Sequence, residues 1–193
     1  MLERIGPPMS SPVSAGRPLA CDRAVVGQRS RPRLCLPEDV RFREATRRDD
    51  PFLYSLLVER YEQETANISG MARGELPTFE QHVEHLDRSP YKRMEIIVVD
   101  GADVGMMYLG HENVAGCFVL KEHVARGVGL AACYRFFASC GRPVIGHFNP
   151  SNRPAYRTVE RLGFVLTERL PHKLTYELRG PLADPYRRLR QQR

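Results

Sequence analysis

Apolar and polar side chains alternate from residue 40 to residue 46, which is typical of a strand with one buried face. Asp50 and Pro51 follow as a helix start, because Asp favours the cap and Pro favours the first helical position. Behind them, apolar residues recur at the spacing of a helix face: Phe52, Leu53, Leu56 and Leu57. The pattern therefore predicts a strand followed by a helix at the start of the folded region.

The pattern continues with further strands and helices up to residue 178. Thr78 and Gln81 stand at the spacing of a capping box, which starts a second helix that runs to about Leu86. Then come strands at 93–99, 104–109 and 114–120, a helix at 127–139, a strand at 144–148, a helix at 152–162, and strands at 164–170 and 174–178. This order favours an α/β domain of the α+β type, with a mostly antiparallel mixed sheet of about seven strands and helices on both faces.

Charge is distributed unevenly along the 193 residues, which carry a net charge of +6. Residues 1–38 hold six Arg against three acidic residues, and residues 180–193 hold four Arg against one Asp. The stretch 39–179 is neutral, with 19 basic and 19 acidic residues. Because a nucleic-acid-binding domain carries its positive charge on the folded surface, the neutral middle disfavours nucleic acid as a partner.

The two ends of the chain lack the patterns of the middle. Residues 1–38 contain six of the fifteen Pro and no sustained periodicity, so we expect a disordered arm rich in Pro and Arg. Residues 180–193 are expected to form a basic tail. A single domain, residues 39–179, is predicted between them.

The composition also bears on membranes, metals and location. No apolar run approaches the roughly 18 residues of a membrane helix, so no membrane partner is expected. The five Cys are odd in number and show no C-x-x-C spacing, which disfavours a disulfide framework and a zinc ribbon. His82 and His85 stand at a spacing that can ligate a metal ion, but the pattern offers no third ligand, so no metal is expected. A reducing cytoplasm is the simplest location.

A loop that contains glycine joins the strand at 114–120 to the helix at 127–139. Arg126, Gly127 and Gly129 stand at the helix start, where backbone N–H groups have no partners and the helix dipole is positive. Glycine lets an anion approach those N–H groups. The loop therefore predicts either a phosphate-binding cradle or a tight strand–helix turn.

A second polar loop, Asn149-Pro-Ser-Asn152, follows the next strand and leads into a helix that ends at Leu-Gly-Phe164. The two strands that precede these helices are expected to lie side by side and to separate where an extended anionic ligand enters. Asn149 and Asn152 would then supply amide groups to the same cleft. The alternative for Asn152 is a simple helix cap.

The two loops together resemble motifs of the GNAT superfamily of acetyl-CoA-dependent N-acetyltransferases. The first is similar to the GNAT pyrophosphate signature Q/R-x-x-G-x-G/A, and the second is similar to the Asn…Leu-Gly-Phe helix. The predicted order of elements is also the GNAT order, and the resemblance covers roughly residues 40–179. Shorter pieces, such as Leu76-Pro-Thr-Phe-Glu-Gln-His82, resemble a bacterial branch found among small-molecule and sugar-pathway acetyltransferases.

The resemblance implies contacts to acetyl-CoA as a co-substrate. In GNATs the backbone of the fourth strand pairs with the pantetheine arm, and the corresponding residues here are Cys117, Phe118, Val119 and Leu120. The pyrophosphate would be held by the N–H groups of Val124, Ala125, Arg126, Gly127, Val128 and Gly129. Asn149 would face the same cleft, and Asn152 would bond the pantetheine. Because Val124 replaces the usual Gln or Arg of the signature, the cradle would depend on backbone groups and on Arg126.

The resemblance leaves the proton-transfer groups open. The positions where many GNATs carry a catalytic Glu, Tyr or Ser are occupied here by Val114, Val159 and Ala155. Glu112 and His111 remain as candidate bases, and Tyr156 remains as candidate acid, one turn before Val159 on the same helix face. Catalysis by positioning alone, with water carrying the protons, is the alternative.

The acceptor is expected to bind over the first two helices and the loop between them. Candidate contacts are Asn67, Ser69, His82 and Tyr108. The resemblance implies that an acetyl group passes to a primary amine of a small molecule, with an amino sugar as the leading class. A peptide or protein N-terminus, a non-catalytic acyl-CoA-binding module and a basic scaffold remain alternatives, and a homodimer is left open.

Overall fold

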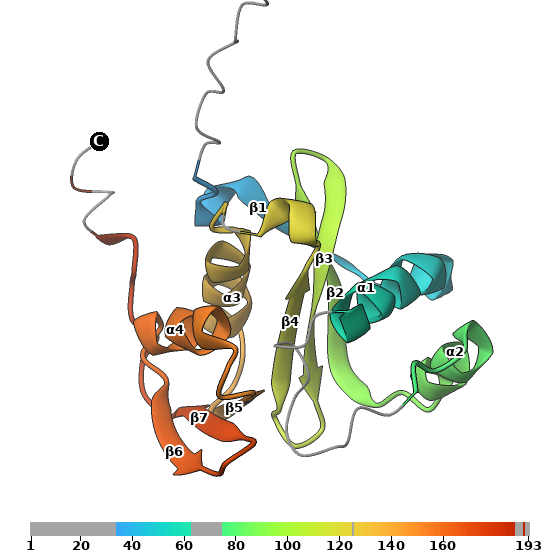
Figure 1. Ribbon diagram of the computed structural model, residues 1–193. Helices are drawn as coiled ribbons and strands as arrows, with labels where there is room; N and C mark the ends of the chain where they lie inside the picture. The colour runs from blue at the N-terminus through green and yellow to red at the C-terminus, as the bar shows by residue number, and fades with distance from the viewer. Residues whose placement is uncertain (1–33, 63–74, 125, 188–190, 192–193) are drawn as a thin grey trace, which may run out of the picture. The chain divides into compact units, whose positions relative to one another are not determined.

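The computed structural model describes residues 34–62, 75–124, 126–187 and 191, and the predicted order of elements is confirmed (Figure 1). The seven strands are β1 Val40–Glu44, β2 Tyr91–Val99, β3 Ala102–Gly110, β4 Ala115–Val119, β5 Val144–Phe148, β6 Val165–Arg169 and β7 Leu174–Leu178. The α-helices are α1 Asp50–Glu62, α2 Phe79–Asp87, α3 Val128–Ala138 and α4 Arg153–Arg161. The fold is therefore α+β, as the sequence predicts.

The seven strands form two hydrogen-bonded sheets. The first has the order β1-β2-β3-β4 and the second has the order β5-β7-β6, and all of these pairings are antiparallel. The sheets meet at one parallel bridge between Val114 and Ile145, where the Ile145 N–H donates to the Asn113 carbonyl at 2.9 Å. The two parallel strands β4 and β5 are thus joined only at their beginnings.

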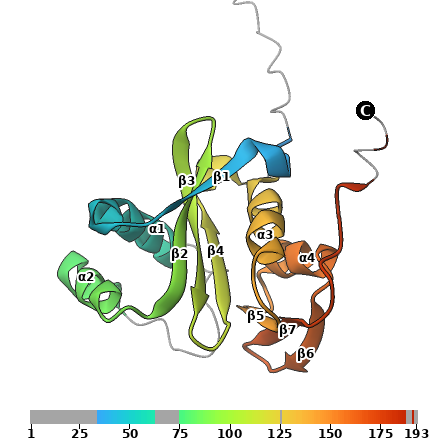
Figure 2. The same ribbon diagram turned by 180° about the vertical axis from the view of Figure 1, so that it is seen from behind.

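Helices cover both faces of the first sheet, with α1 and α2 on one side and α3 on the other (Figures 1 and 2). Side chains alternate between the faces along each strand, so each face builds its own core. The larger core packs α3 against the sheet around the fully buried side chains of Val128, Phe136 and Met107. The smaller core joins α1 to the opposite face through Leu53, Leu56, Ile96 and Met106.

Local sequence signals explain where the elements begin and turn. The predicted capping box is confirmed, because the Gln81 N–H donates to the Thr78 hydroxyl at 3.3 Å and the Thr78 N–H donates to the Gln81 side chain at 2.9 Å. Asp100 and Gly101 have φ angles of 53° and 80°. Positive φ at both central residues is the requirement of the two-residue hairpin turn that connects β2 to β3.

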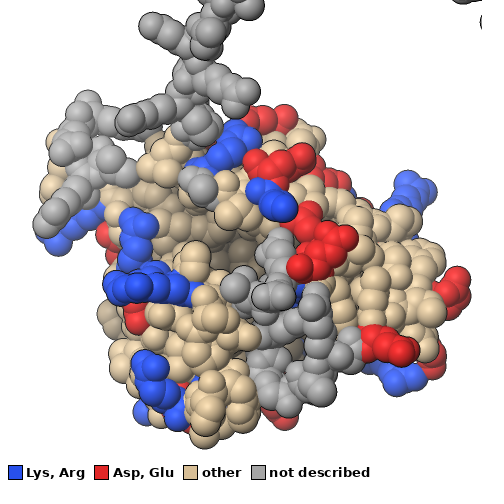
Figure 3. Space-filling model, viewed as in Figure 1, with Lys and Arg blue, Asp and Glu red and all other residues tan. Residues whose placement is uncertain are grey.

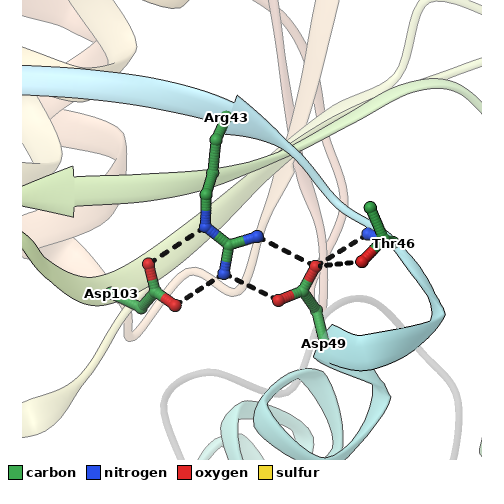
Figure 4. A network of polar contacts seen from close by, with 4 residues as sticks. All are labelled: Arg43, Thr46, Asp49 and Asp103. Carbon is green, nitrogen blue, oxygen red and sulfur yellow. Dashed lines mark hydrogen bonds and ion pairs between the residues drawn. The ribbon is translucent and has the colours of Figure 1, made fainter.

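A polar network ties the start of α1 to two strands (Figure 4). The Arg43 guanidinium on β1 donates to both oxygens of Asp49, at 2.9 and 2.6 Å, and to both oxygens of Asp103 on β3, at 3.2 and 2.6 Å. The Thr46 N–H and hydroxyl also donate to Asp49, at 2.7 and 3.0 Å. These donors hold the pKa of the Asp49 carboxyl down at about 2, with the Arg43 bonds as the main cause.

The core also takes side chains from outside residues 39–179. Cys35 and Leu36 are 5% and 8% exposed, and the Cys35 N–H donates to the Arg126 carbonyl at 2.8 Å. Tyr186 is 3% exposed and packs edge-to-face on Tyr134 of α3. Among the described residues, the core therefore takes side chains from Cys35 at one end to Tyr186 at the other. Residues 1–33 of the expected arm and residues 188–190 and 192–193 of the expected tail lie outside the described residues.

Candidate active site

The edge of β4 that faces β5 is the centre of the candidate site. One edge of β4 pairs with β3 from Ala115 to Val119, and the other makes no strand pairing among the described residues beyond the bridge at Val114. The backbone of Cys117, Phe118 and Val119 therefore presents its outer groups to the space where β4 and β5 separate. The sequence predicts this separation, and an extended ligand could add to this edge as a strand does.

The first glycine loop ends at the start of α3, close to this edge. Gly127 caps α3 with a φ of 83° and has no side chain, so the helix start has no side-chain cap bond among the described residues. A Cβ placed on Gly129 would have only Val119 Cγ2 nearby, at 3.9 Å, so the N-terminus of α3 faces β4 at this point. Open N–H groups at a helix start favour an anion.

Arg126 adds a side chain to this loop. Its Nη1 group lies 3.1 Å from Nδ1 of His123, while its Nε atom is buried with no hydrogen-bond partner among the described residues. A buried N–H without a partner is costly, and an anionic ligand would satisfy it. Val124 is 56% exposed, and Ala125 lies outside the described residues.

The second polar loop lies at the end of β5 and uses its own side chains locally. The Asn152 side-chain oxygen caps α4 by accepting from the Ala155 N–H at 3.4 Å. The Asn149 oxygen accepts from the N–H and hydroxyl of Ser151, at 2.9 and 2.6 Å. The amide nitrogen of Asn152 and the second lone pair of its oxygen could contact a ligand in the cleft.

A pocket that is partly open to solvent lies on the opposite side of β4, between α1, α2 and the first sheet. The apolar lining consists of Leu53, Leu56, Leu57, Leu86, Met94, Met106 and Phe118. The polar lining consists of Arg60, His82, Tyr91 and Tyr108. His82 and Tyr108 are two of the substrate contacts that the sequence predicts, whereas Asn67 and Ser69 lie outside the described residues.

Tyr108 reaches across to β4 because residue 116 is glycine. Tyr108 and Gly116 are register partners in the β3–β4 pair, and a Cβ on Gly116 would lie 2.6 Å from the Tyr108 hydroxyl oxygen. The ring of Tyr108 therefore occupies the space that any side chain at residue 116 would need. This places the phenol against the strand whose other edge faces β5.

Arg60 and Tyr91 were missed by the sequence reasoning. The Arg60 guanidinium carbon lies 4.5 Å from the centre of the Phe118 ring, a cation–π contact, and burial lowers the Arg60 pKa. The Tyr91 ring lies 4.5 Å from the Tyr108 ring, centre to centre. Burial raises the pKa of Tyr91 to about 12 and raises the pKa of Tyr108 as well, so both phenols remain protonated at neutral pH.

Known proteins give a match to this arrangement only at the level of structure, since no protein-family model and no curated protein sequence matches the chain. An acetyltransferase from Thermus thermophilus is similar with a TM-score of 0.57 and 23% identity, over 72% of this chain and 96% of its own. A spermidine N-acetyltransferase from Vibrio cholerae, in complex with CoA and spermine, is similar with a TM-score of 0.58 and 15% identity, over 72% of this chain and 94% of its own. A ribosomal-protein-alanine N-acetyltransferase from Brucella melitensis has a TM-score of 0.57 and 16% identity, over 72% of this chain and 99% of its own. The chain therefore has a GNAT-like fold.

Within the GNAT fold, the three candidate catalytic residues lie apart from the pocket. His111 and Glu112 lie in the turn between β3 and β4, and His111 Nε2 lies 3.1 Å from the Ser89 carbonyl oxygen. Tyr156 stacks on Tyr176 with ring centres 6.0 Å apart and planes at 10°, and the Tyr176 hydroxyl donates to Glu160 at 2.8 Å. Neither the structure nor the comparisons test these three roles, which stay predictions.

The cysteine on the fourth strand of this GNAT fold points into the core. Cys117 packs against the core that includes α3, and the pKa of the Cys133 thiol on α3 is raised by its hydrogen bond with Cys117 and by burial. The contribution of Cys117 to the site is therefore through its backbone.

Charge is uneven on the face of the molecule drawn in Figure 3. Lys and Arg gather on the side where α4 lies, while Asp and Glu gather on the opposite side, and the surface between them is hollowed. Helix α4 itself carries three exposed Arg at positions 153, 157 and 161. Positive potential on this side would favour an anionic ligand in the cleft.

The described part of the chain offers neither a metal cluster nor a membrane helix. It contains no group of three or more His, Cys, Asp and Glu that could hold a metal ion. His82 and His85 contact different rings, Tyr54 at 5.7 Å and Tyr91 at 6.1 Å. None of the helices in this part combines the length and hydrophobicity needed to cross a bilayer.

Proposed function

We propose that the chain is an N-acetyltransferase that transfers an acetyl group from acetyl-CoA to a primary amine of a small molecule. The observation that carries the proposal is the open edge of β4, which lies between the start of α3 on one side and the pocket on the other. In this arrangement one strand separates the place for a cofactor from the place for an acceptor. The GNAT fold, which the chain shares with structures of N-acetyltransferases, supports the same function.

The residues present fit such a cofactor. The backbone of Cys117 to Leu120 would pair with the pantetheine arm, and the N–H groups at the start of α3 would hold the pyrophosphate together with Arg126. The cofactor supplies an activated thioester. The unpartnered Nε of Arg126 and the uncapped first turn of α3 are the observations that favour an anion here.

The chain then has to position the amine and manage two protons. The C–N bond forms as the C–S bond breaks, one proton leaves the amine, and the thiolate that departs takes up a proton. His82 can accept a hydrogen bond from the amine, because its ring is uncharged at neutral pH. Burial is the main cause, since it lowers the His82 pKa. Tyr156 from α4, and Glu112 or His111 from the β3–β4 turn, are the remaining proton carriers that we propose.

The first test follows free thiol while the wild-type protein is incubated with acetyl-CoA and a panel of primary amines. We expect thiol release that depends on both the protein and an amine. CoA binding is measured in parallel by calorimetry. Binding of CoA without thiol release for any amine would instead favour a non-catalytic acyl-CoA-binding module, which the Val residues at 114 and 159 and Ala155 make a specific rival.

Gly129 provides the matched variant for the cradle. A Cβ at Gly129 would point toward Val119 Cγ2 at 3.9 Å, an ordinary contact, so we expect Gly129→Val to fold and to weaken CoA binding at least tenfold. Gly141 also has open space around it and lies beyond the other end of α3, so Gly141→Val is the control and should bind CoA as the wild type does. Equal CoA affinity in the two variants would contradict the cradle.

A further inference from the structure

Among the described residues, the lining of the pocket beside β4 has a cation and no carboxylate. Arg60 is the one residue with a full charge among its described lining, and no ion pair joins Arg60 to an acidic residue in the described part of the chain. The guanidinium instead rests on the Phe118 ring, and burial disfavours its charge. A desolvated cation without an anion is costly, so an anionic group of a ligand would relieve a cost that the protein carries.

Hydrogen-bond donors line the same pocket as this cation. The phenols of Tyr91 and Tyr108 line the same pocket and stay protonated at neutral pH, so each has a hydroxyl proton to donate. Nε2 of His82 is buried without a hydrogen-bond partner among the described residues. The polar atoms of the pocket therefore suit an anion and one further polar group on a ligand.

The rest of the lining is aliphatic or aromatic. Leu53, Leu56 and Met106 belong to the buried core beneath the pocket, and Phe118 and Tyr108 stack with ring centres 6.4 Å apart. Such a surface stabilises an apolar or aromatic body by excluding water. A hydroxyl-rich amino sugar would leave much of this surface without an apolar partner, and it would leave Arg60 without an anion.

A polyamine fits the same lining poorly. The similar Vibrio cholerae structure is that of a spermidine N-acetyltransferase, and a polyamine is a chain of cationic amines. Recognition of such a chain calls for carboxylates, whereas the described lining has none and places Arg60 in the pocket. Like charges brought together in a partly buried site repel one another.

We propose that the acceptor is a small amine that carries a carboxylate on an apolar body, as an amino acid with an apolar side chain does. Arg60 binds the carboxylate, with the hydroxyls of Tyr91 and Tyr108 as further donors. The apolar body lies against the partly exposed lining side chains Leu57, Leu86 and Met94. A planar guanidinium suits a carboxylate because it offers two parallel N–H groups. This inference rests on the proposed acetyl transfer, and it replaces the amino sugar with a different acceptor class.

The test compares three acceptors that share one apolar body: L-phenylalanine, L-phenylalanine amide and phenethylamine. Spermidine and glucosamine complete the panel, and thiol release gives kcat/KM for each. We expect kcat/KM for L-phenylalanine to exceed that for phenethylamine at least tenfold. L-Methionine, which has a different apolar side chain, should do the same. Higher kcat/KM for the amide, for spermidine or for glucosamine would overturn the inference and leave acetyl transfer itself intact.

Arg60→Met supplies the decisive variant, because Met keeps apolar contacts with Phe118 and removes the charge. We expect kcat/KM for L-phenylalanine to fall at least tenfold in Arg60→Met, and to fall by a larger factor than kcat/KM for phenethylamine. Arg60→Lys should lie between Arg60→Met and the wild type. Arg88→Met is the control, since Arg88 is exposed beyond the end of α2 and pairs with Glu84. An equal loss for both acceptors would contradict a carboxylate contact.

A binding measurement separates the two levels of the proposal. Calorimetry of N-acetyl-L-phenylalanine, the expected product, needs no turnover and should show binding to the wild type and at least tenfold weaker binding to Arg60→Met. Binding of this kind without thiol release would refute acetyl transfer and keep the anion site. Thiol release from amines with no effect of Arg60→Met on either measurement would refute the anion site and keep acetyl transfer.

Discussion

At the scale of single residues, the pair formed by Tyr108 and Gly116 shows how one missing side chain shapes the site. The phenol lies in the space that a side chain at residue 116 would fill, so the wall between pocket and cleft is thin at this point. The pairing can be derived from the sequence, since two strands joined by a turn place Tyr108 opposite Gly116. The direction of the ring cannot, because it depends on Tyr91 and Phe118 from the neighbouring strands.

Gly116→Ala should destabilise the protein by about 1–3 kcal/mol, because the new methyl group overlaps the Tyr108 ring and forces it to move. In a Tyr108→Ala background the same change should cost less than about 0.5 kcal/mol, since the ring is gone. Urea unfolding of the four proteins in this cycle measures the coupling. Equal costs in the two backgrounds would mean that the overlap is relieved elsewhere.

Arg60 illustrates what residue-level reading of the sequence misses. In the sequence, Arg60 belongs to the last turn of a helix, where a basic residue is ordinary and usually faces solvent. Its burial is decided by Phe118, which lies 58 positions later, and by two tyrosines from two other strands. No local pattern carries that information, whereas the predicted contacts His82 and Tyr108 line the same pocket and stay predictions as substrate contacts.

At the scale of elements, the order of strands and helices was predictable because its signals are local. Alternation marks strands, and the capping box at Thr78 and the Asp100-Gly101 turn lie within a few residues of the boundaries they set. The division into two sheets is not local, since it depends on which strands pair across the chain. The separation of β4 from β5 was predicted only through the two loops that follow these strands.

The network around Arg43 joins three elements and should give the stability a dependence on acidic pH. The folded-state pKa of Asp49 is about 2, below that of an unfolded Asp, so its contribution is fully present above about pH 4. This contribution is lost as the pH falls from about 4 toward 2. Asp49→Asn should cost about 2 kcal/mol at pH 7, in line with hydrogen bonds to a charged group, and much less at pH 2.

Asp103→Asn is the matched control for this network, because Asp103 bonds the same guanidinium from a more exposed position. The side chain of Asp103 is 37% exposed and that of Asp49 is 9% exposed, so the expected cost is smaller, about 0.5–1 kcal/mol. Chemical unfolding at pH 7 and at about pH 2 to 4 gives the loss of unfolding free energy for each variant and its dependence on pH. If the cost of Asp49→Asn does not change with pH, the Asp49 carboxylate is not the source of the pH dependence of stability.

At the scale of the whole molecule, the packed region extends past both ends of the domain predicted from the sequence. Cys35, Leu36 and Tyr186 are buried although they lie in segments whose composition favours disorder. Composition averages over a window, so it cannot detect a few apolar residues at the edge of a Pro- and Arg-rich segment that find a place in the core. The neutral charge of the middle remains compatible with an anionic ligand, because a local cradle is sufficient.

Truncation tests where the folded unit begins. Removal of residues 1–31 keeps Cys35 and Leu36, whereas removal of residues 1–38 deletes both buried side chains and the hydrogen bond to the Arg126 carbonyl. The longer deletion should therefore lower the free energy of unfolding by about 3 kcal/mol relative to the shorter one. Urea unfolding of the two proteins measures the difference, and equal midpoints would place the start of the folded unit after residue 38.

The single bridge between Val114 and Ile145 has a consequence for the folding pathway. In the first sheet, β2, β3 and β4 follow one another through short turns, and in the second sheet β6 and β7 do the same. Contacts of low sequence separation form early because little loop entropy is lost in closing them. We therefore expect the two sheets to form as separate nuclei, and their docking through α3 to be the late step of folding.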